Sequence, residues 1–166
     1  MNDFVVQARP ITEADLPALL DIYASTRAEE LALVPAWSEE QKRAFVEQQF
    51  YAQHKYYREF YVGSDLQLLE ANHTTIGRLY VHWNYSATEV RIMDIAILPP
   101  YRGHGLGSQL LQAVIQKGTE LGKSTTIHVE CNNPALRLYE RLGFVKIGEF
   151  NTYYYLMEWK PKNGIS

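Results

Sequence analysis

Three glycines alternate with other residues in a short loop just past the middle of the chain. They are Gly103, Gly105 and Gly107, and they lead into a segment whose apolar residues recur at helical spacing. Glycine has no Cβ, so the backbone can turn tightly here and several N–H groups can converge on one point. The start of a helix adds its partial positive charge at the same place. This pattern predicts a binding site for a phosphate or pyrophosphate group, with Arg102 and His104 as charged contacts at its rim.

Three classes of ligand and one purely structural alternative can account for such a loop. A mononucleotide P-loop ends in Lys followed by Ser or Thr, and the segment from Tyr101 to Ser108 contains no lysine. A dinucleotide fingerprint has the spacing Gly-x-Gly-x-x-Gly and usually lies near the N-terminus, whereas this loop reads Gly-x-Gly-x-Gly. Coenzyme A is the third ligand to consider. The structural alternative is a tight turn whose glycines serve packing alone.

Hydrophobic periodicity and turn residues place this loop within an alternation of strands and helices. A buried strand ends at Pro99-Pro100, and the loop and an amphipathic helix follow it. The expected strands are 4–9, 66–71, 75–85, 89–98, 125–130, 144–149 and 152–159, with a turn at 72–73. The expected helices begin at Thr12, at Ser38 (running toward Tyr61), at Gly103 (running to Leu121) and at Asn133-Pro134 (closed by Gly143). This order predicts an α/β protein with a mixed sheet and helices on both faces.

Two segments resemble the GNAT superfamily of acetyl-CoA-dependent N-acetyltransferases. The run Arg102-Gly103-His104-Gly105-Leu106-Gly107 is similar to that family's signature of Arg or Gln, two residues, Gly, one residue, and Gly or Ala. The run from His128 to Phe144, which contains NPALRLYERLGF, resembles the family's fifth strand and fourth helix. Together the motifs cover roughly residues 89–144. The resemblance implies a single GNAT domain over residues 1–166, with an α/β (α+β) fold and a mixed, mostly antiparallel central sheet of about six to seven strands.

The resemblance also implies acetyl-CoA as co-substrate, and its site residues carry over position by position. The glycine loop matches the family's pyrophosphate site, which maps to Arg102, Gly103, His104, Gly105, Leu106, Gly107 and Ser108. The preceding strand, which in the family pairs its backbone with the pantetheine arm, maps to Ile95, Ala96 and Ile97. Asn132 and Asn133 both match the asparagine that contacts the pantetheine side. Tyr139 matches the tyrosine that often protonates the leaving thiolate.

Direct attack of an amine on a thioester needs a base, an oxyanion donor and an acid. An alkyl ammonium has a pKa near about 10.4, so its deprotonation at neutral pH costs roughly 4 kcal/mol. A free backbone amide near Ile97 is the candidate oxyanion donor, and Tyr139 is the candidate acid for the thiolate. Periodicity alone favours a core role for Tyr139, because it shares a helical stripe with Leu138 and Leu142. The family resemblance favours the catalytic role.

Two carboxylates are candidates for the base. Many relatives carry a glutamate three residues before Asp94, where this chain has Arg91. Asp94 is the nearest carboxylate on the expected strand, and a buried carboxylate is costly without a partner. Two interpretations therefore stay open: Asp94 is the base, or it pairs with Arg91 or with a backbone amide. Glu130, at the end of its strand, is a second candidate base, and a solvated surface position is its alternative role.

Composition limits the classes of partner. The 166 residues carry a formal net charge of -3, which argues against nucleic acid. No apolar stretch is long enough for a membrane span, so no membrane partner is expected. The absence of a secretory leader pattern and the single cysteine, Cys131, predict a cytoplasmic location. The five histidines have no metal-ligand spacing, so no metal is expected.

Three hypotheses about function follow, in decreasing order of support. The first is an enzyme that transfers the acetyl group of acetyl-CoA to a primary amine of a small molecule or peptide. The second is a non-catalytic sensor of the same fold that binds an acyl-CoA. The third is an unrelated nucleotide-binding protein. Tyr139 favours the enzyme, and analogy with similar proteins allows a homodimer.

Overall fold

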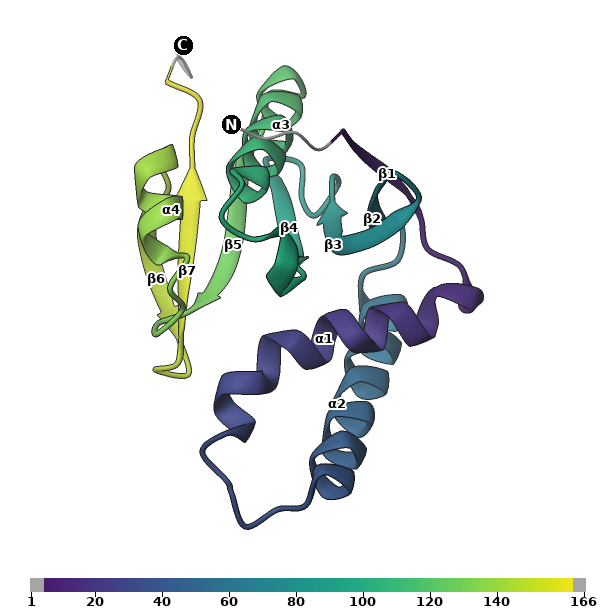
Figure 1. The fold of residues 1–166 in the computed structure, drawn as a ribbon. Coiled ribbons are helices and arrows are strands. Elements are labelled where there is room, and N and C mark those ends of the chain that lie inside the picture. The colour runs from purple at the N-terminus through teal and green to yellow at the C-terminus, as the bar shows by residue number, and fades with distance from the viewer. Residues whose placement is uncertain (1–4, 163–166) are drawn as a thin grey trace.

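The computed structural model describes residues 5–162, whose strands form one seven-stranded sheet (Figure 1). The strands are β1 (Val6–Pro10), β2 (Asp65–Ala71), β3 (Thr74–His82), β4 (Glu89–Ile97), β5 (Ser124–Glu130), β6 (Val145–Phe150) and β7 (Tyr154–Trp159). Their order across the sheet is β1-β2-β3-β4-β5-β7-β6. Every neighbouring pair is antiparallel except β4 and β5, which are parallel. The expectation of a mixed, mostly antiparallel sheet is confirmed.

The helices of the described residues begin where side chains or backbone geometry favour a start. They are α1 (Leu16–Leu31), α2 (Glu39–Phe60), α3 (Leu106–Glu120) and α4 (Leu136–Leu142), with short 3-10 helices η1 (Glu13–Asp15) and η2 (Pro99–Tyr101). At the start of α2, the Ser38 hydroxyl accepts from the Gln41 amide at 3.1 Å, and the Gln41 side chain accepts from the Ser38 amide at 2.8 Å. This reciprocal pair is the predicted capping box.

Three α-helices start later than the sequence predicts. The helix expected from Thr12 opens as the 3-10 helix η1 before α1, and the other two have local reasons. The helix expected from Gly103 begins at Leu106, because Gly103 and Gly105 have φ angles of +80° and +78°, outside the right-handed helical region. The helix expected to have Pro134 in its first position begins at Leu136. There the side-chain oxygen of Asn133 accepts from the Ala135 amide at 2.8 Å, so the asparagine closes a turn ahead of the helix.

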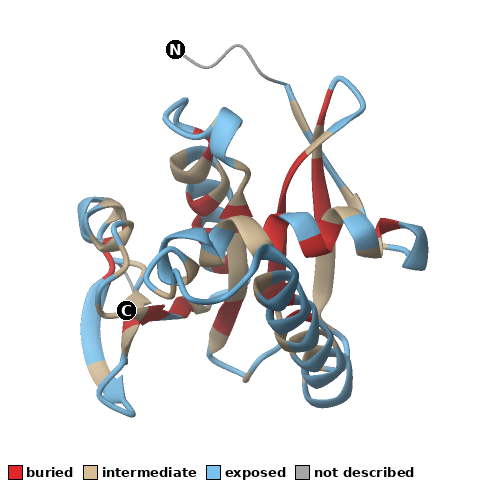
Figure 2. Cartoon of the chain, turned by 60° about the horizontal axis from the view of Figure 1, so that its bottom comes forward, coloured by how far each residue is buried: buried red, intermediate tan, exposed pale blue. Residues whose placement is uncertain are grey.

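Helices cover both faces of the sheet, as expected from the alternation of elements. One core joins α3 and α4 to the sheet, and it includes Ile92, Leu111, Val114, Ile127 and Tyr139. A second core joins α1 and α2 to the opposite face, and it includes Leu19, Phe50, Leu68, Tyr80 and Ala96. Figure 2 shows the buried residues running along the central strands and the helix sides that face them.

The sheet changes its pairing in the middle of β4. The parallel register with β5 runs from Glu89↔Ser124 to Ile92↔Ile127 and ends there. The next residue, Met93, forms a bulge, because Val81 of β3 pairs with Ile92 and Tyr80 pairs with Asp94. From Asp94 to Ile97, β4 continues beside β3, while β5 from His128 to Glu130 continues beside β7. Among the described residues, the second half of β4 is therefore paired on one side only.

Candidate active site

The second half of β4 offers backbone groups on its unpaired side. The Leu98 amide donates to the Ile76 carbonyl of the neighbouring strand at 2.8 Å. Backbone groups of successive strand residues point to opposite edges, so those of Ile95 and Ile97 face the side where β5 has separated. The Arg102 Nε confirms this direction, because it donates to the Ile97 carbonyl at 2.8 Å. The Ile97 amide thus lies where the sequence prediction placed an oxyanion donor, and the Ile95 amide shares its direction.

The three predicted pantetheine residues do not contribute equally. Alternation turns the backbone groups of Ala96 toward β3, where its partner in the register is Arg78. The Ala96 side chain is buried in the core beneath α1 and α2. Only Ile95 and Ile97, of these three, direct their backbone groups to the unpaired side.

The glycine loop lies directly after this strand and ends at the N-terminus of α3. Residues Arg102 to Gly105 are exposed, and positive φ angles at Gly103 and Gly105 fold the backbone back on itself. The Gln109 amide is bonded to the Gly105 carbonyl at 3.1 Å, which begins the helical ladder. The amides of Leu106, Gly107 and Ser108 precede that bond and form the free donor end of the helix. The loop therefore presents unpaired backbone donors at the helix start, where the sequence predicts an anion cradle.

The loop's side chains have different surroundings. The Leu106 side chain is buried in the core, so only its amide can serve a ligand. The Arg102 guanidinium uses its Nε on the Ile97 carbonyl, which ties the loop to the end of β4. The His104 side chain is exposed. A Cβ at Gly107 would meet Leu138 of α4 at 3.6 Å, an ordinary contact, so protein packing alone does not require glycine there.

The predicted acid, Tyr139, lies on α4 with its ring buried against Phe144 at a centroid distance of 5.7 Å. No hydrogen bond to its hydroxyl occurs among residues 5–162. Burial, and after it the nearby Asp94 carboxylate, raise the pKa of Tyr139 well above its usual value. The phenol therefore keeps its proton at neutral pH and can donate it, which satisfies the first requirement of a general acid.

The two candidate asparagines differ in their availability. Asn133 uses its side-chain oxygen on the Ala135 amide and is partly buried. Asn132 is exposed, and its side chain contacts no polar group among the described residues. Asn132 is the one of the pair whose amide side chain is available to a ligand.

The predicted base, Asp94, has a partner that the sequence did not reveal. Its carboxylate pairs with the guanidinium of Arg78 on β3. Arg78 is buried, with 2% of its surface exposed. Arg78 also donates to the Gln53 side chain at 2.9 Å, and its guanidinium lies over the Tyr80 ring at 4.7 Å. Burial alone would lower the pKa of Arg78, but the Asp94 carboxylate and the surrounding rings raise it overall. The suggested pairing of Asp94 with Arg91 was wrong, because the bulge at Met93 turns the two side chains apart.

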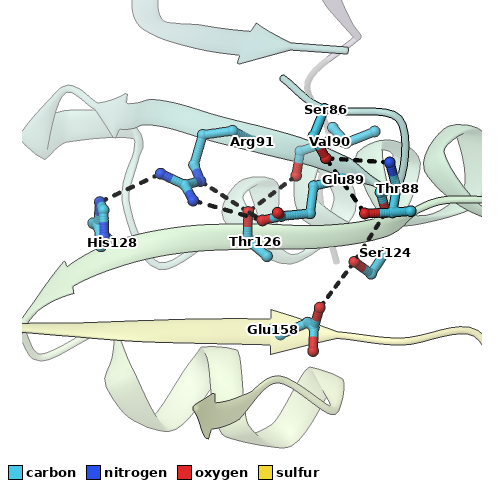
Figure 3. A network of polar contacts seen from close by, with 9 residues as sticks. All are labelled: Ser86, Thr88, Glu89, Val90, Arg91, Ser124, Thr126, His128 and Glu158. Atoms are coloured by element: carbon cyan, nitrogen blue, oxygen red, sulfur yellow. Dashed lines mark hydrogen bonds and ion pairs between the residues drawn. The ribbon is translucent and has the colours of Figure 1, made fainter. Parts of the chain in front are cut away.

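Arg91 belongs to a separate polar network in the paired half of β4 (Figure 3). Its Nε donates to the Thr126 hydroxyl oxygen at 2.8 Å, and its other nitrogens lie 3.5 Å from His128 Nδ1 and 3.6 Å from Glu89. The Tyr85 ring covers the guanidinium at 4.1 Å. This network bridges β4 to β5 one residue before the two strands separate. Arg91 is thus a buried cation at the position where the family resemblance predicts a glutamate.

Glu130 and Cys131, two further residues considered in the sequence, each lie beside a protein group. Glu130 lies 3.6 Å from Arg27 of α1 and is partly exposed. Cys131 is partly buried beside the Thr152 carbonyl at 3.9 Å. Across residues 5–162, no cluster of three or more His, Cys, Asp or Glu side chains could hold a metal ion. No helix of the described chain has the length and apolar character needed to cross a membrane.

Sequence reasoning missed three residues that shape the site. Arg78 and Gly77 lie on β3 opposite the unpaired half of β4, and strand register alone brings them there. A Cβ at Gly77 would lie 2.2 Å from the Ala96 carbonyl oxygen, so only glycine allows this approach. Tyr57 of α2 donates to the Met93 carbonyl at the bulge at 3.4 Å. Gly77 followed by a charged residue in a buried strand was the one available signal, since glycine in a strand often marks a close backbone approach.

The fold matches solved structures of acetyltransferases. The structure of PaiA N-acetyltransferase from Thermoplasma acidophilum in complex with coenzyme A superposes with a TM-score of 0.71 at 16% identity. That match covers 95% of this chain and 99% of the other. The model of the Acetyltransferase (GNAT) family matches residues 18–144. The chain belongs to the GNAT acetyltransferase family, as the motifs predicted.

Curated relatives match a shorter part of the chain. An N-alpha-acetyltransferase of Sulfurisphaera tokodaii is 35% identical over 66 residues, which are 38% of this chain and 40% of that protein. The spermine/spermidine N(1)-acetyltransferase of Bacillus subtilis is 44% identical over 54 residues, 31% of this chain and 36% of that protein. The chain therefore spans less than half the length of each of these relatives.

Proposed function

We propose that the protein is an acetyl-CoA-dependent N-acetyltransferase that acylates a primary amine by direct attack on the thioester. The observation that carries this proposal is the glycine loop at the start of α3, placed after the half of β4 that pairs on one side only. Family membership supports the same reaction class, since the family's name describes acetyl transfer. The acceptor is a small-molecule or peptide amine. A cytoplasmic location and a homodimer remain sequence-based proposals.

The chain's own groups account for acetyl-CoA binding in two parts. Free amides at the start of α3, from Leu106 to Ser108, suit the pyrophosphate, and the helix dipole adds to them. The amides and carbonyls of Ile95 and Ile97 suit the pantetheine arm, because they face the side from which β5 has separated. Asn132 is exposed next to that opening and suits a further polar contact.

The same groups supply the chemistry of transfer. Asp94, the carboxylate on the unpaired half of β4, accepts the ammonium proton directly or through water, which frees the nitrogen lone pair. The nitrogen bonds to the thioester carbon, and the oxygen that becomes negative is stabilised by an unpaired amide of β4. The carbon–sulfur bond breaks, the thiolate takes a proton from Tyr139, and the nitrogen loses its second proton to become the amide. That proton returns to the Tyr139 oxygen through solvent, because the raised pKa of Tyr139 favours the protonated phenol.

A free-thiol release assay tests the proposal. Purified protein with acetyl-CoA and a panel of amines should release coenzyme A only when both substrates are present. Calorimetric titration with acetyl-CoA, NAD and ATP should show binding of acetyl-CoA alone. Saturable acetyl-CoA binding without turnover on any amine class would instead support the sensor of the same fold. Binding of NAD or ATP in preference to acetyl-CoA would contradict both.

A further inference from the structure

Aromatic rings of α2, of the residue that follows it and of the loop after β3 gather near the bulge in β4. Tyr57 reaches the bulge through its hydrogen bond to the Met93 carbonyl. The Tyr61 ring lies edge-on to Tyr57 at 5.8 Å and stacks with Tyr85 at 6.3 Å. Tyr85 in turn covers the guanidinium of Arg91. A continuous series of rings thus leads from the bulge to the buried arginine.

The series continues across β5. His128 lies 3.5 Å from Arg91, and its ring is 5.9 Å from the exposed Phe150 of β6 (Figure 3 shows the Arg91–His128 contact). Burial, and after it the Arg91 charge, lower the pKa of His128 below its usual value, so the imidazole is neutral at neutral pH. A neutral ring at this position extends the aromatic surface without adding charge.

The carboxylates of the two separating strands are all matched by arginines. β4 and β5 carry Glu89, Asp94 and Glu130. Glu89 lies 3.6 Å from Arg91, Asp94 pairs with Arg78, and Glu130 lies 3.6 Å from Arg27. An acceptor with several ammonium groups needs several uncompensated carboxylates, because each buried charge must be paired. Apart from Asp94, the proposed base, these two strands offer no carboxylate for a second ammonium group.

From the rings and the paired charges we infer that the preferred acceptor is a small primary monoamine that carries an aromatic ring. This inference rests on the proposed N-acetyltransferase function and names its substrate class. The single amine reaches the thioester beside Asp94, where its charge is removed before attack. The ring of the acceptor packs against Tyr61 and Tyr85, since aromatic pairs attract beyond their buried area.

The test compares three acceptors: 2-phenylethylamine, propylamine and spermidine. We expect kcat/KM for 2-phenylethylamine to exceed that for propylamine about tenfold, because only the first can pack against the rings. Spermidine should be the poorest of the three. Tyr61→Leu should raise KM for 2-phenylethylamine about three- to tenfold and leave kcat and the propylamine kinetics unchanged. Tyr51→Leu is the control, because Tyr51 is an exposed tyrosine of α2 that lies outside the ring series.

The outcomes separate this inference from the function on which it rests. Turnover of spermidine or propylamine with no preference for the aromatic amine would overturn the substrate class and leave the N-acetyltransferase intact. An equal loss for all amines in Tyr61→Leu would also overturn it, because that pattern indicates a structural role. Turnover of no amine, despite bound acetyl-CoA, would overturn both.

Discussion

The two halves of β4 differ in how many neighbouring strands they pair with. Residues 89–92 pair with β3 on one side and with β5 on the other, and the buried Arg91 links β4 to β5. Residues 94–97 pair with β3 alone, and their other side is open toward the glycine loop and α4. One continuous strand therefore supports the fold in its first half and the site in its second, and the bulge at Met93 divides them.

The difference predicts that substitutions in or facing the two halves have opposite signatures. Groups of the paired half contact only protein, so their loss should lower the free energy of unfolding. Groups that face the open half are available to contact a ligand. Their loss should therefore lower activity rather than the free energy of unfolding. A residue whose substitution lowers both the free energy of unfolding and the activity should lie where packing of the fold also positions the groups of the open half.

Tyr139→Phe gives the largest expected effect and tests the open half. We expect kcat to fall about 10²- to 10⁴-fold, because the thiolate loses its proton donor. The free energy of unfolding should change little, since the hydroxyl has no hydrogen-bond partner among residues 5–162. The raised pKa of Tyr139 also predicts no alkaline loss of activity below about pH 10 from this group. Near-normal kcat in the variant would assign Tyr139 to the core.

Arg91→Leu gives the second-largest expected effect and tests the paired half of β4. We expect a loss of about 3 kcal/mol in the free energy of unfolding, measured in urea, because the change breaks a buried ion-paired network. Arg58→Leu, at an exposed position on α2, is the control and should be nearly neutral. Unchanged stability with lost activity would place Arg91 in the site rather than in the scaffold.

Gly77→Ala should affect stability and binding together, because Gly77 lies opposite the open half of β4. The added Cβ would overlap the Ala96 carbonyl oxygen, so either β3 or β4 must shift, at a cost of about 2 kcal/mol. The shift should also weaken acetyl-CoA binding, since it moves the amides of Ile95 and Ile97. Gly148→Ala on β6 is the control, because a Cβ there meets nothing within 4 Å. Loss of stability alone would show that the open half tolerates displacement.

Asp15→Asn gives the smallest effect and sets a baseline away from β4. Arg9 holds the pKa of Asp15 down to about 2, from its usual 3.8, through charged hydrogen bonds at 2.8 and 2.9 Å. A lowered pKa stabilises the fold above pH 3.8, and that contribution disappears as the pH falls through about 2. We expect the variant to lose about 1 kcal/mol at pH 7 after solvent screening, and activity should not change. A loss that persists below pH 2 would contradict the ionic origin.

Features encoded within a few residues could be predicted from the sequence, and features set by strand register could not. The glycine loop, the Ser38 capping box and the turn at 72–73 depend on neighbouring residues, and all three are present. The partner of Asp94 depends on how β3 and β4 align, and Arg78 is 16 residues away. The bulge at Met93 also could not be predicted from hydrophobic periodicity. A bulge is defined by the pairing of two strands, and only that pairing shows where the side chains switch from one face of the sheet to the other.

The central claim is that backbone amides at the start of α3 bind the phosphates of acetyl-CoA. Gly105→Asp tests it directly, because a Cβ there meets nothing within 4 Å and the new carboxylate repels an anion. A side chain at the φ of +78° is strained, and Asp adopts this region more readily than most residues. Gly122→Asp is the matched control, since Gly122 follows the other end of α3 with φ of +74° and equal space. In calorimetric titration, Gly105→Asp should weaken acetyl-CoA binding more than about tenfold, while Gly122→Asp binds normally. Equal affinity in the two variants would contradict the claim.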